Sequence, residues 1–243
     1  MKPTFSRLLA IMLLLCCIST AISQNPYKTT WKRELAWVGG SGIGIGTAAL
    51  LHVHNQPFTA EKVAALDLGR VPRFERFVTR QYSISAQHNS DILLFTSVAS
   101  PVLLLLDKNI RQDAPTAAFL VGESMWLNLA LTSLCKEIVR RPRPFCYNPN
   151  APLSEKLKRD ARASFFSGHT SMSAAATFSA AQIWSDYHPD SEWKPLVWAT
   201  AVAIPATVGF LRVKGGKHFI SDVATGFIVG GACGLLIPRL HRK

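Results

Sequence analysis

Six apolar segments alternate with polar and basic stretches along the 243-residue chain, and this alternation restricts the fold more than any other feature. Several segments hold only about 16 uncharged residues, which in a helix measure roughly 24 Å against a hydrocarbon layer of about 30 Å. Length alone therefore does not separate membrane helices from the buried helices of a soluble bundle. Six such segments exceed what one soluble core needs, so we predict an all-α fold, a six-helix transmembrane bundle. The segments are residues 35–53, 92–106, 114–135, 171–184, 196–211 and 219–237.

The overall charge is strongly positive, with a formal net charge of +12 and a pI near 9.8. Such a charge would suit a nucleic-acid-binding protein. The basic residues, however, lie between apolar segments rather than on a polar face interleaved with aromatic residues. We therefore expect basic loops of a membrane protein and no nucleic-acid partner. The hydrophobic content of 48% and the mean hydropathy of +0.16 are modest for a membrane protein, and they keep a soluble alternative open.

The first 23 residues have the pattern of a secretory signal peptide. Lys2 and Arg7 precede an apolar run at residues 8–18, and small residues follow before Gln24. We expect cleavage after Ser23, which would leave residues 24–243 as one domain.

The apolar segment at residues 35–53 is rich in glycine. Glycines on a helix surface let a neighbouring helix approach closely, so we expect tight packing here. In the segment at 114–135, Glu123 and Asn128 need hydrogen-bond partners if the segment is buried, and we expect those partners on other helices. The glycines concerned are Gly39, Gly40, Gly42, Gly44 and Gly46.

Three basic and histidine-containing clusters lie between residues 136 and 222, each at the end of an apolar segment. In the first cluster, Lys136 and Arg143 are seven residues apart, about two helical turns. Both can point the same way until Pro142 and Pro144 end the helix. Two cations that face one point predict an anion-binding site.

The second cluster, Ser167-Gly168-His169, opens the apolar segment at 171–184. Its backbone N–H groups are thus expected at a helix N-terminus, which favours binding of a phosphate. The glycine lets the backbone approach the anion closely.

In the third cluster, His218 and Asp222 are four residues apart at the start of the last apolar segment, and Arg212 precedes them. A helix would place the Asp222 carboxylate beside the imidazole, where it could hold one ring nitrogen and leave the other facing the site. This arrangement is typical of a nucleophile or a base.

Together the clusters resemble the three-part signature of the type 2 phosphatidic acid phosphatase family, shared with bacterial non-specific acid phosphatases and vanadium haloperoxidases: K-x6-R-P, P-S-G-H and S-R-x5-H-x3-D. The resemblance covers roughly residues 90 to 238, and nine of the eleven defining positions match. Phe166 replaces the proline of the second part, and Leu211 replaces the serine of the third. Neither change removes a charged group or an imidazole, although the lost hydroxyl at Leu211 is expected to weaken phosphate binding slightly.

The resemblance implies an active site at one membrane face and metal-independent hydrolysis of a lipid phosphate monoester or diphosphate through a phosphohistidine. His218, oriented by Asp222, is expected to attack phosphorus. His169 is expected to protonate the leaving oxygen and later to activate water. The sequence contains no cluster at metal-ligand spacing, so we expect no cofactor. The expected phosphate-binding residues are Lys136, Arg143, Ser167, Gly168 and Arg212.

The alternative is a soluble periplasmic non-specific acid phosphatase of the same superfamily, which the signal peptide and the modest hydropathy favour. Haloperoxidase chains are usually much longer, and a non-catalytic binding or transport protein would not need the complete set of residues. The sequence does not choose among phospholipid, polyprenyl and lipid A phosphates as substrates, and it leaves the oligomeric state open.

Two indications conflict about which side of the membrane carries the active site. If the signal peptide is cleaved and residues 35–53 span the membrane, three crossings precede Lys136 and the active site faces the cytoplasm. The distribution of Lys and Arg favours that side weakly. Family members usually act on the extracytoplasmic side, so the resemblance implies an integral protein of the bacterial cell envelope with an extracytoplasmic active site.

Overall fold

The computed structural model describes residues 25–243, so the predicted signal peptide at residues 1–23 lies outside the described part. Within 25–243 the chain is helical, and its only β-type pairing is an isolated bridge between Tyr27 and Arg242. The all-α prediction is thus confirmed for these residues. The long helices are α2 (Trp31–His54), α4 (Ile84–Ala99), α6 (Ala114–Val139), α8 (Gly168–Tyr187), α9 (Lys194–Lys214) and α10 (Ile220–Leu240).

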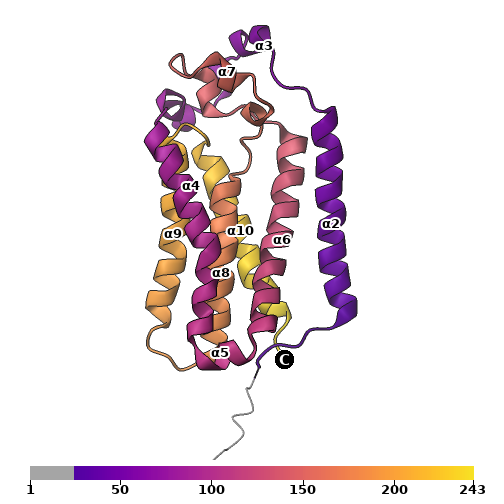
Figure 1. Ribbon diagram of the computed structural model, residues 1–243. Helices are drawn as coiled ribbons and strands as arrows, with labels where there is room; N and C mark the ends of the chain where they lie inside the picture. Colours follow the sequence, from indigo (N-terminus) through magenta and orange to yellow (C-terminus); the bar gives the residue numbers. More distant parts are fainter. Residues whose placement is uncertain (1–24) are drawn as a thin grey trace, which may run out of the picture.

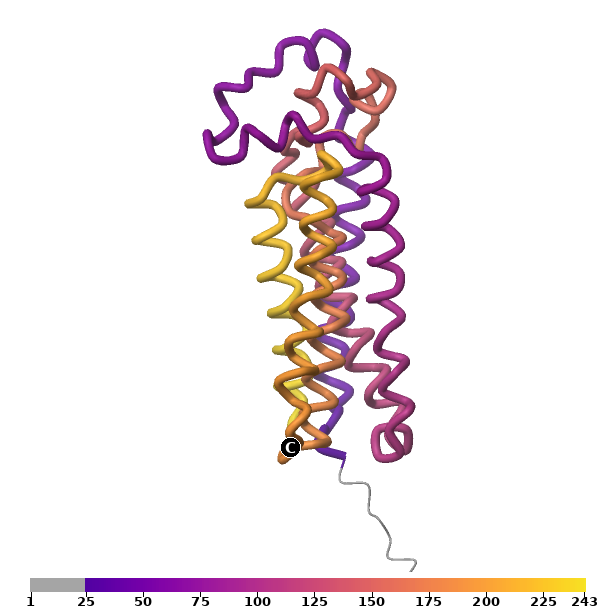
Figure 2. Tube along the Cα trace, turned by 90° about the vertical axis from the view of Figure 1, so that its left-hand side faces the viewer, coloured from indigo at the N-terminus to yellow at the C-terminus, as the bar shows by residue number. Residues whose placement is uncertain are grey.

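The long helices run side by side, and short helices lie at the two ends of the bundle (Figure 1; Figure 2). We call the end that carries α3 and α7 the motif end, because the three sequence clusters lie there. The end that carries α5 and the C-terminus is called the far end. The short helices are α3 (Ala60–Ala64), η1 (Leu68–Arg70), η2 (Arg73–Arg80), η3 (Ser100–Leu106), α5 (Lys108–Gln112), η4 (Pro144–Tyr147), α7 (Leu153–Lys156) and η5 (Arg159–Arg162).

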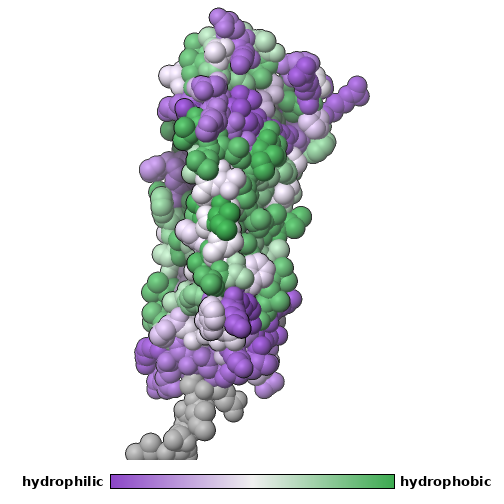
Figure 3. All heavy atoms as spheres, turned by 90° about the vertical axis from the view of Figure 1, so that its right-hand side faces the viewer, coloured by the Kyte–Doolittle hydropathy of each residue, from purple (hydrophilic) through white to green (hydrophobic). Residues whose placement is uncertain are grey.

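On the face that Figure 3 shows, an apolar belt lies across the middle of the bundle between two polar ends. Large apolar side chains in the belt are turned outward, among them Ile43, Phe95 and Ile228, which are 73%, 71% and 68% exposed. Water would not tolerate so extensive an apolar surface. The chain is therefore an integral membrane protein, and this surface argues against the soluble alternative.

Five helical segments of the described chain are long and apolar enough to cross a membrane. The sixth long helix, α8, does not belong to this set because serine, threonine and alanine make up most of its length, and most of its side chains are buried. We predicted six membrane spans, and five segments of the described chain qualify by length and composition. The five segments are Trp31–His54, Ile84–Leu106, Ala114–Tyr147, Lys194–Lys214 and Ile220–Leu240.

Helix α10 lies directly against α8 along a row of three glycines four residues apart. A β-carbon at any of them would collide with the α8 backbone, so only glycine permits this helix separation. The β-carbon would lie 2.6 Å from Ser167 O at Gly226, 2.0 Å from Ser171 O at Gly230 and 2.7 Å from Ala175 O at Gly234.

Helix α2 lies at the edge of the bundle, beside α6 (Figure 1). Of its five glycines only Gly44 contacts another helix, since a β-carbon there would lie 3.2 Å from Leu134 Cδ1. No atom lies within 4 Å of such a β-carbon at Gly39, Gly40, Gly42 or Gly46. The prediction that these glycines serve close packing is therefore wrong for four of them, because they face away from the bundle.

Of the two side chains of α6 that were expected to bond to other helices, Asn128 does so and Glu123 does not. Asn128 donates only to Met172 Sδ, at 3.9 Å, and its Oδ1 has no hydrogen-bond partner. Glu123 is 3% exposed, and neither of its carboxylate oxygens accepts a hydrogen bond within the described chain. The expected interhelical hydrogen bonds of Glu123 do not form.

Candidate active site

The first cluster turns sharply where α6 ends. The helix stops at Val139, and Arg140 adopts a left-handed conformation with φ 50° and ψ 38°. The expectation that the helix continues to Pro142 is wrong, because this residue redirects the chain one turn earlier. Lys136 nevertheless reaches the loop that precedes α8, where its Nζ donates to Ala163 O at 2.6 Å.

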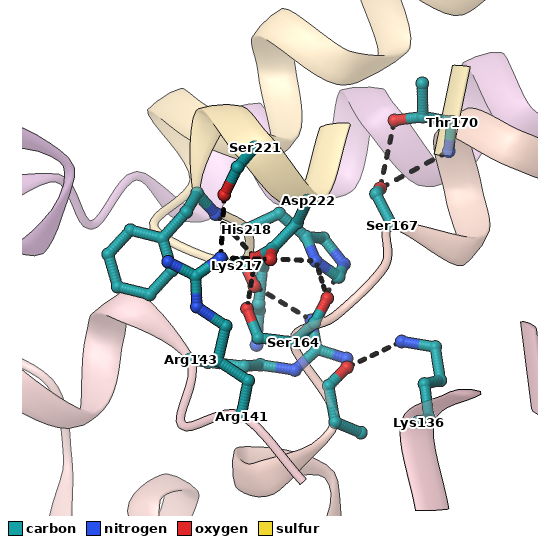
Figure 4. Close-up of polar contacts among 12 residues, drawn as sticks. Lys136, Arg141, Arg143, Ser164, Ser167, Thr170, Lys217, His218, Ser221 and Asp222 are labelled. Carbon is teal, nitrogen blue, oxygen red and sulfur yellow. Dashed lines mark hydrogen bonds and ion pairs between the residues drawn. The ribbon is translucent and has the colours of Figure 1, made fainter. Parts of the chain in front are cut away.

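The second cluster begins α8, as predicted. Ser167 is the N-cap residue, and its Oγ lies 3.4 Å from Thr170 N and 2.9 Å from Thr170 Oγ1 (Figure 4). Its backbone N–H donates to Asp222 O at 2.9 Å, which ties the start of α8 to α10. Gly168 faces α6, since a β-carbon there would lie 3.6 Å from Lys136 Cε. The helix N-terminus and the first cluster are thus in contact.

His218 is 1% exposed and held by backbone. Its Nδ1 lies 2.7 Å from Ser164 O, and a carbonyl oxygen can only accept, so Nδ1 carries the proton. Its Nε2 then has a free lone pair, which accepts from Arg143 Nη1 at 3.2 Å. Burial, followed by the Arg143 and Lys136 cations, holds the pKa of His218 well below its usual value. The ring is therefore neutral at physiological pH.

Asp222 does not hold His218 directly as expected. The distance from Asp222 Oδ2 to His218 Nδ1 is 3.8 Å, and the carboxylate accepts from other donors. Its Oδ2 accepts from Ser164 Oγ at 2.5 Å and from Phe219 N at 2.9 Å. Ser164 connects the two residues instead: its hydroxyl donates to Asp222, and its backbone carbonyl accepts from His218 Nδ1 (Figure 4).

Arg141 and Glu75 form a support behind Asp222 that the sequence analysis did not assign. Arg141 Nη1 donates to Asp222 Oδ1 at 2.5 Å, and Nη2 donates to Glu75 Oε2 at 2.7 Å. Glu75 is fully buried, and its Oε1 accepts from Ser221 N at 2.7 Å. Arg141 lies within the first cluster, so its position in the sequence pointed to the site. Glu75 lies 61 residues before Lys136, in a polar stretch with no motif that would have pointed to it.

His169 and Arg212 meet at Asp91, a residue that the sequence analysis also missed. His169 Nε2 lies 2.8 Å from Asp91 Oδ1, and Arg212 Nη1 lies 3.2 Å from the same oxygen. Arg212 Nη1 also donates to Ser90 Oγ at 3.2 Å. The only sequence signal for Asp91 was its position at the boundary of an apolar segment.

A second carboxylate, that of Asp160, forms an ion pair with Arg143. Asp160 Oδ1 accepts from Arg143 Nη2 at 2.6 Å. Burial acts to raise the pKa of Asp160, but the Arg143 and Lys136 cations outweigh it and lower the pKa to about 2. Asp160 is therefore an anion at every physiological pH, and it neutralises part of the positive charge.

The three clusters thus form one site. Arg143 contacts His218, Lys136 lies beside Gly168 at the start of α8, and Arg212 meets His169 at Asp91. A neutral imidazole whose Nε2 accepts from Arg143, with two further cations and a second histidine in the same site, can bind an anion and attack it once Arg143 turns to that anion.

The comparisons with known proteins identify the family of the chain. The sequence pattern of the PAP2 superfamily matches residues 117–243, the part of the chain that holds all three clusters. A Schizosaccharomyces pombe protein named "Probable diacylglycerol pyrophosphate phosphatase 1" is 32% identical over 130 residues, which are 44% of this chain and 47% of the relative. The match thus spans about half the length of that relative. No solved structure matches the chain.

The family pattern covers just over half of the 243 residues. It includes both histidines and all three cations of the site. The chain therefore belongs to the PAP2 superfamily.

Proposed function

We propose that this protein is a membrane-bound lipid phosphatase that removes the terminal phosphate from a lipid phosphate monoester or diphosphate. The observation that carries the proposal is the neutral His218 ring, whose Nε2 accepts from Arg143 at the polar end of an apolar bundle, in a site that also holds Lys136 and Arg212. A lipid in the membrane would present its headgroup at this level. The name of the yeast relative, which contains diacylglycerol pyrophosphate, supports a lipid diphosphate as one candidate substrate.

The proposed reaction has two steps. In the first, His218 Nε2 forms a bond to phosphorus while the bond to the leaving oxygen breaks, and His169, protonated beside the bound phosphate dianion, gives that oxygen its proton. In the second, water attacks phosphorus, His169 accepts the water proton, and the N–P bond breaks to release inorganic phosphate. Charge on the phosphoryl oxygens is neutralised by cations and by N–H groups at the α8 N-terminus, so the chemistry needs no metal. The groups concerned are the side chains of Lys136, Arg143 and Arg212, the hydroxyl of Ser167 and the backbone N–H of Gly168.

Asp91 and Asp160 contact the groups that we assign to phosphate, and we propose that phosphate displaces them. Asp91 bridges His169 and Arg212, and Asp160 engages Arg143. The carboxylates would keep the cations neutralised until substrate arrives. His169 Nε2 would then be released to act on the leaving oxygen.

Asp91→Asn and Asp160→Asn test this displacement. Each change removes a negative charge that competes with phosphate, so we expect inorganic phosphate to inhibit the variants more tightly, by up to about fivefold. The inhibition constant in a phosphate-release assay is the measurement. Weaker inhibition in both variants would mean instead that the carboxylates orient the cations for phosphate.

The central experiment measures phosphate release by the purified protein in detergent with excess EDTA. The substrates are a phosphatidate, a diacylglycerol pyrophosphate, a polyprenyl diphosphate, a lipid A phosphate and a water-soluble phosphomonoester. We expect the best lipid to exceed the soluble ester clearly. Faster turnover of the soluble ester would contradict lipid specificity, and loss of all release in EDTA while the protein remains folded would contradict metal-independent chemistry.

Two histidine variants test the assigned roles. We expect His218→Ala to lower kcat by more than about 1,000-fold because it removes the nucleophile. His169→Ala should lower kcat by about 100- to 10,000-fold because it removes the acid and base. His188→Ala, a histidine at the far end, is the matched control. Normal turnover in the His218 variant would refute the mechanism.

The phosphohistidine can be sought directly. A reaction quenched in alkali, in which an N–P bond survives, should yield phosphate attached to the protein during turnover. The label should be absent from the His218→Ala variant. Label that persists in that variant would place the covalent bond on another residue.

The side of the membrane needs its own test. Helix α2 begins at the far end and three long helices precede the first cluster, so residue 25 and the active site lie at opposite ends (Figure 1). A cleaved signal peptide and an extracytoplasmic site therefore exclude each other in this bundle. We propose the extracytoplasmic site, which places the C-terminus in the cytoplasm. The yeast relative gives no support for a bacterial envelope.

An epitope tag after Lys243 tests the orientation. We expect an antibody to reach the tag only after cells are permeabilised. Labelling of intact cells would place the active site in the cytoplasm and would favour the cleaved signal peptide.

A further inference from the structure

A second cluster of titratable side chains lies at the far end, outside the proposed active site. Glu34 comes from the first turn of α2, Glu123 from α6, and His241 follows the last residue of α10. One ligand-type atom from each lies within 4.8 Å of the other two. His241 is 0% and Glu123 is 3% exposed, so the cluster is screened from water. Among residues 25–243 it is the one group with the composition and spacing of a metal site.

The histidine offers a lone pair to the cluster. His241 Nδ1 lies 2.7 Å from Ile237 O, and because a carbonyl only accepts, Nδ1 carries the proton. In the neutral ring, Nε2 is then an acceptor. It lies 2.7 Å from Glu34 Oε2 and 3.3 Å from Glu123 Oε2. Three electron-rich atoms therefore converge, and a positive charge among them is needed to hold them together.

Glu123 is the independent sign that a ligand belongs here. Both of its oxygens are buried and neither has a hydrogen-bond partner in the described chain. A buried carboxylate without such partners is costly unless a cation neutralises it. Glu34 is different, since its Oε1 accepts from Thr30 N at 2.8 Å and Arg33 Nη2 at 3.2 Å. Its Oε2 remains directed at His241.

We propose that Glu34, Glu123 and His241 bind one divalent transition-metal ion of the Zn²⁺ or Mn²⁺ class. The two positive charges of such an ion match the two carboxylates. A proton on Nε2 would place one positive charge between the two carboxylates, with Arg33 as a second cation on Glu34. One imidazole nitrogen and two carboxylate oxygens are donors that Zn²⁺ and Mn²⁺ accept, whereas Ca²⁺ and Mg²⁺ prefer oxygen alone.

The donor distances are close to those of a metal site. Metal–ligand bonds of about 2.0–2.2 Å put neighbouring tetrahedral ligand atoms about 3.4 Å apart. The Glu123–His241 pair, at 3.3 Å, already has this spacing. The Glu34–His241 pair, at 2.7 Å, would open by about 0.7 Å on binding.

The ion would have a structural role. Helix α2 lies at the edge of the bundle, and of its side chains only Ser41 and Ala48 are buried. The ion would connect the start of α2 to α6 and to the C-terminal end of α10. The three ligands lie 89 and 118 residues apart in sequence, so only the assembled bundle brings them together.

The test uses the full-length protein in detergent. The protein is stripped with a chelator and titrated with Zn²⁺, and the bound metal is counted after gel filtration. We expect one ion per chain in the wild type, and affinity weaker by more than about 100-fold in Glu123→Gln and His241→Gln. Zn²⁺ should also raise the thermal midpoint of the wild type and leave that of both variants unchanged. Glu123→Gln keeps the side-chain shape, which guards against simple misfolding.

His188→Gln is the matched control. Its ring has the same local bonds, with Nδ1 3.0 Å from Trp184 O and Nε2 3.0 Å from Asp107 Oδ2, but it faces one carboxylate. This variant should bind Zn²⁺ like the wild type. A wild-type protein that binds no ion would overturn the proposal in favour of a proton, and equal binding in all four proteins would place the ion elsewhere.

Discussion

Helices α2 and α10 are both apolar and both contain several glycines, yet they use them in opposite ways. In α10, Gly226, Gly230 and Gly234 form one row that touches the α8 backbone, and α10 also carries Asp222. In α2 a single glycine, Gly44, touches a neighbouring helix.

The difference lies in what each row of glycines faces on the neighbouring helix. A spacing of four places residues on one helix face, and α10 maintains it over three glycines. The facing residues of α8, which are Ser167, Ser171 and Ala175, are small and have the same spacing. The glycines of α2 also include two pairs four residues apart, Gly40 with Gly44 and Gly42 with Gly46, but only Gly44 meets a neighbouring helix. The number of glycines therefore does not indicate a packing face, whereas matched rows on two helices do.

The largest expected effect comes from Gly230→Val. The β-carbon would lie 2.0 Å from Ser171 O, and neither backbone can move without separating α8 from α10. Overpacking of this kind costs about 3 kcal/mol or more. We expect little folded protein, measured as the monodisperse fraction in detergent. Gly40→Val, in α2, should behave like the wild type. An equal loss of folded protein in both variants would show that the glycines of α2 and α10 do not differ in their role.

Gly226→Ala should impair activity more than folding. Its β-carbon would lie 2.6 Å from Ser167 O, at the start of α8 and one turn after Asp222. A shift of this contact by a few tenths of an ångström misplaces Ser167 and His169, so we expect kcat to fall by about 10- to 100-fold. The measurement is kcat in a preparation whose thermal midpoint remains well above the assay temperature. Unchanged kcat would show that α8 and α10 can separate here without disturbing the site.

Gly44→Ala should have a small effect. The new β-carbon would lie 3.2 Å from Leu134 Cδ1, the end of a flexible side chain that can turn aside. We expect a stability change within about 1 kcal/mol and normal turnover, because the residue is remote from the site. A thermal midpoint as low as that of Gly226→Ala would make the α2 contact as strict as the α10 contact.

The smallest effect is expected from Gly40→Ala, where no atom lies within 4 Å of the new β-carbon. Alanine favours a helix over glycine by about 0.5–1 kcal/mol, so the thermal midpoint should stay or rise slightly. A clear fall in the thermal midpoint would show that this face of α2 packs against another helix or another molecule.

The fold could be predicted largely because its signals are local. The apolar segment at 196–211 became α9, and the segment at 219–237 became α10, each within a few residues. The predicted helix end was wrong where the backbone conformation of one residue decides it, as at Arg140. The helical nature of α8 was predictable from its apolar run, but its burial among the other helices was not, since burial depends on all the neighbours at once.

The candidate site was predictable for the residues within its motifs and not for the residues around them. His169 and His218 stand in recognisable patterns. Asp91, Glu75 and Ser164 have no such pattern, and each reaches the site from a different part of the chain. The contact expected between His218 and Asp222 was taken by Ser164, which is 54 residues from His218.

The sequence by itself determined the helical segments, the three clusters and membership of the PAP2 superfamily, because each is written in residues a few positions apart. The tertiary structure alone decided which carboxylates neutralise the cations, which glycines are indispensable and that Glu34, Glu123 and His241 meet. These features depend on distances through space between residues far apart in the chain. Such distances are set only when all the helices have packed together.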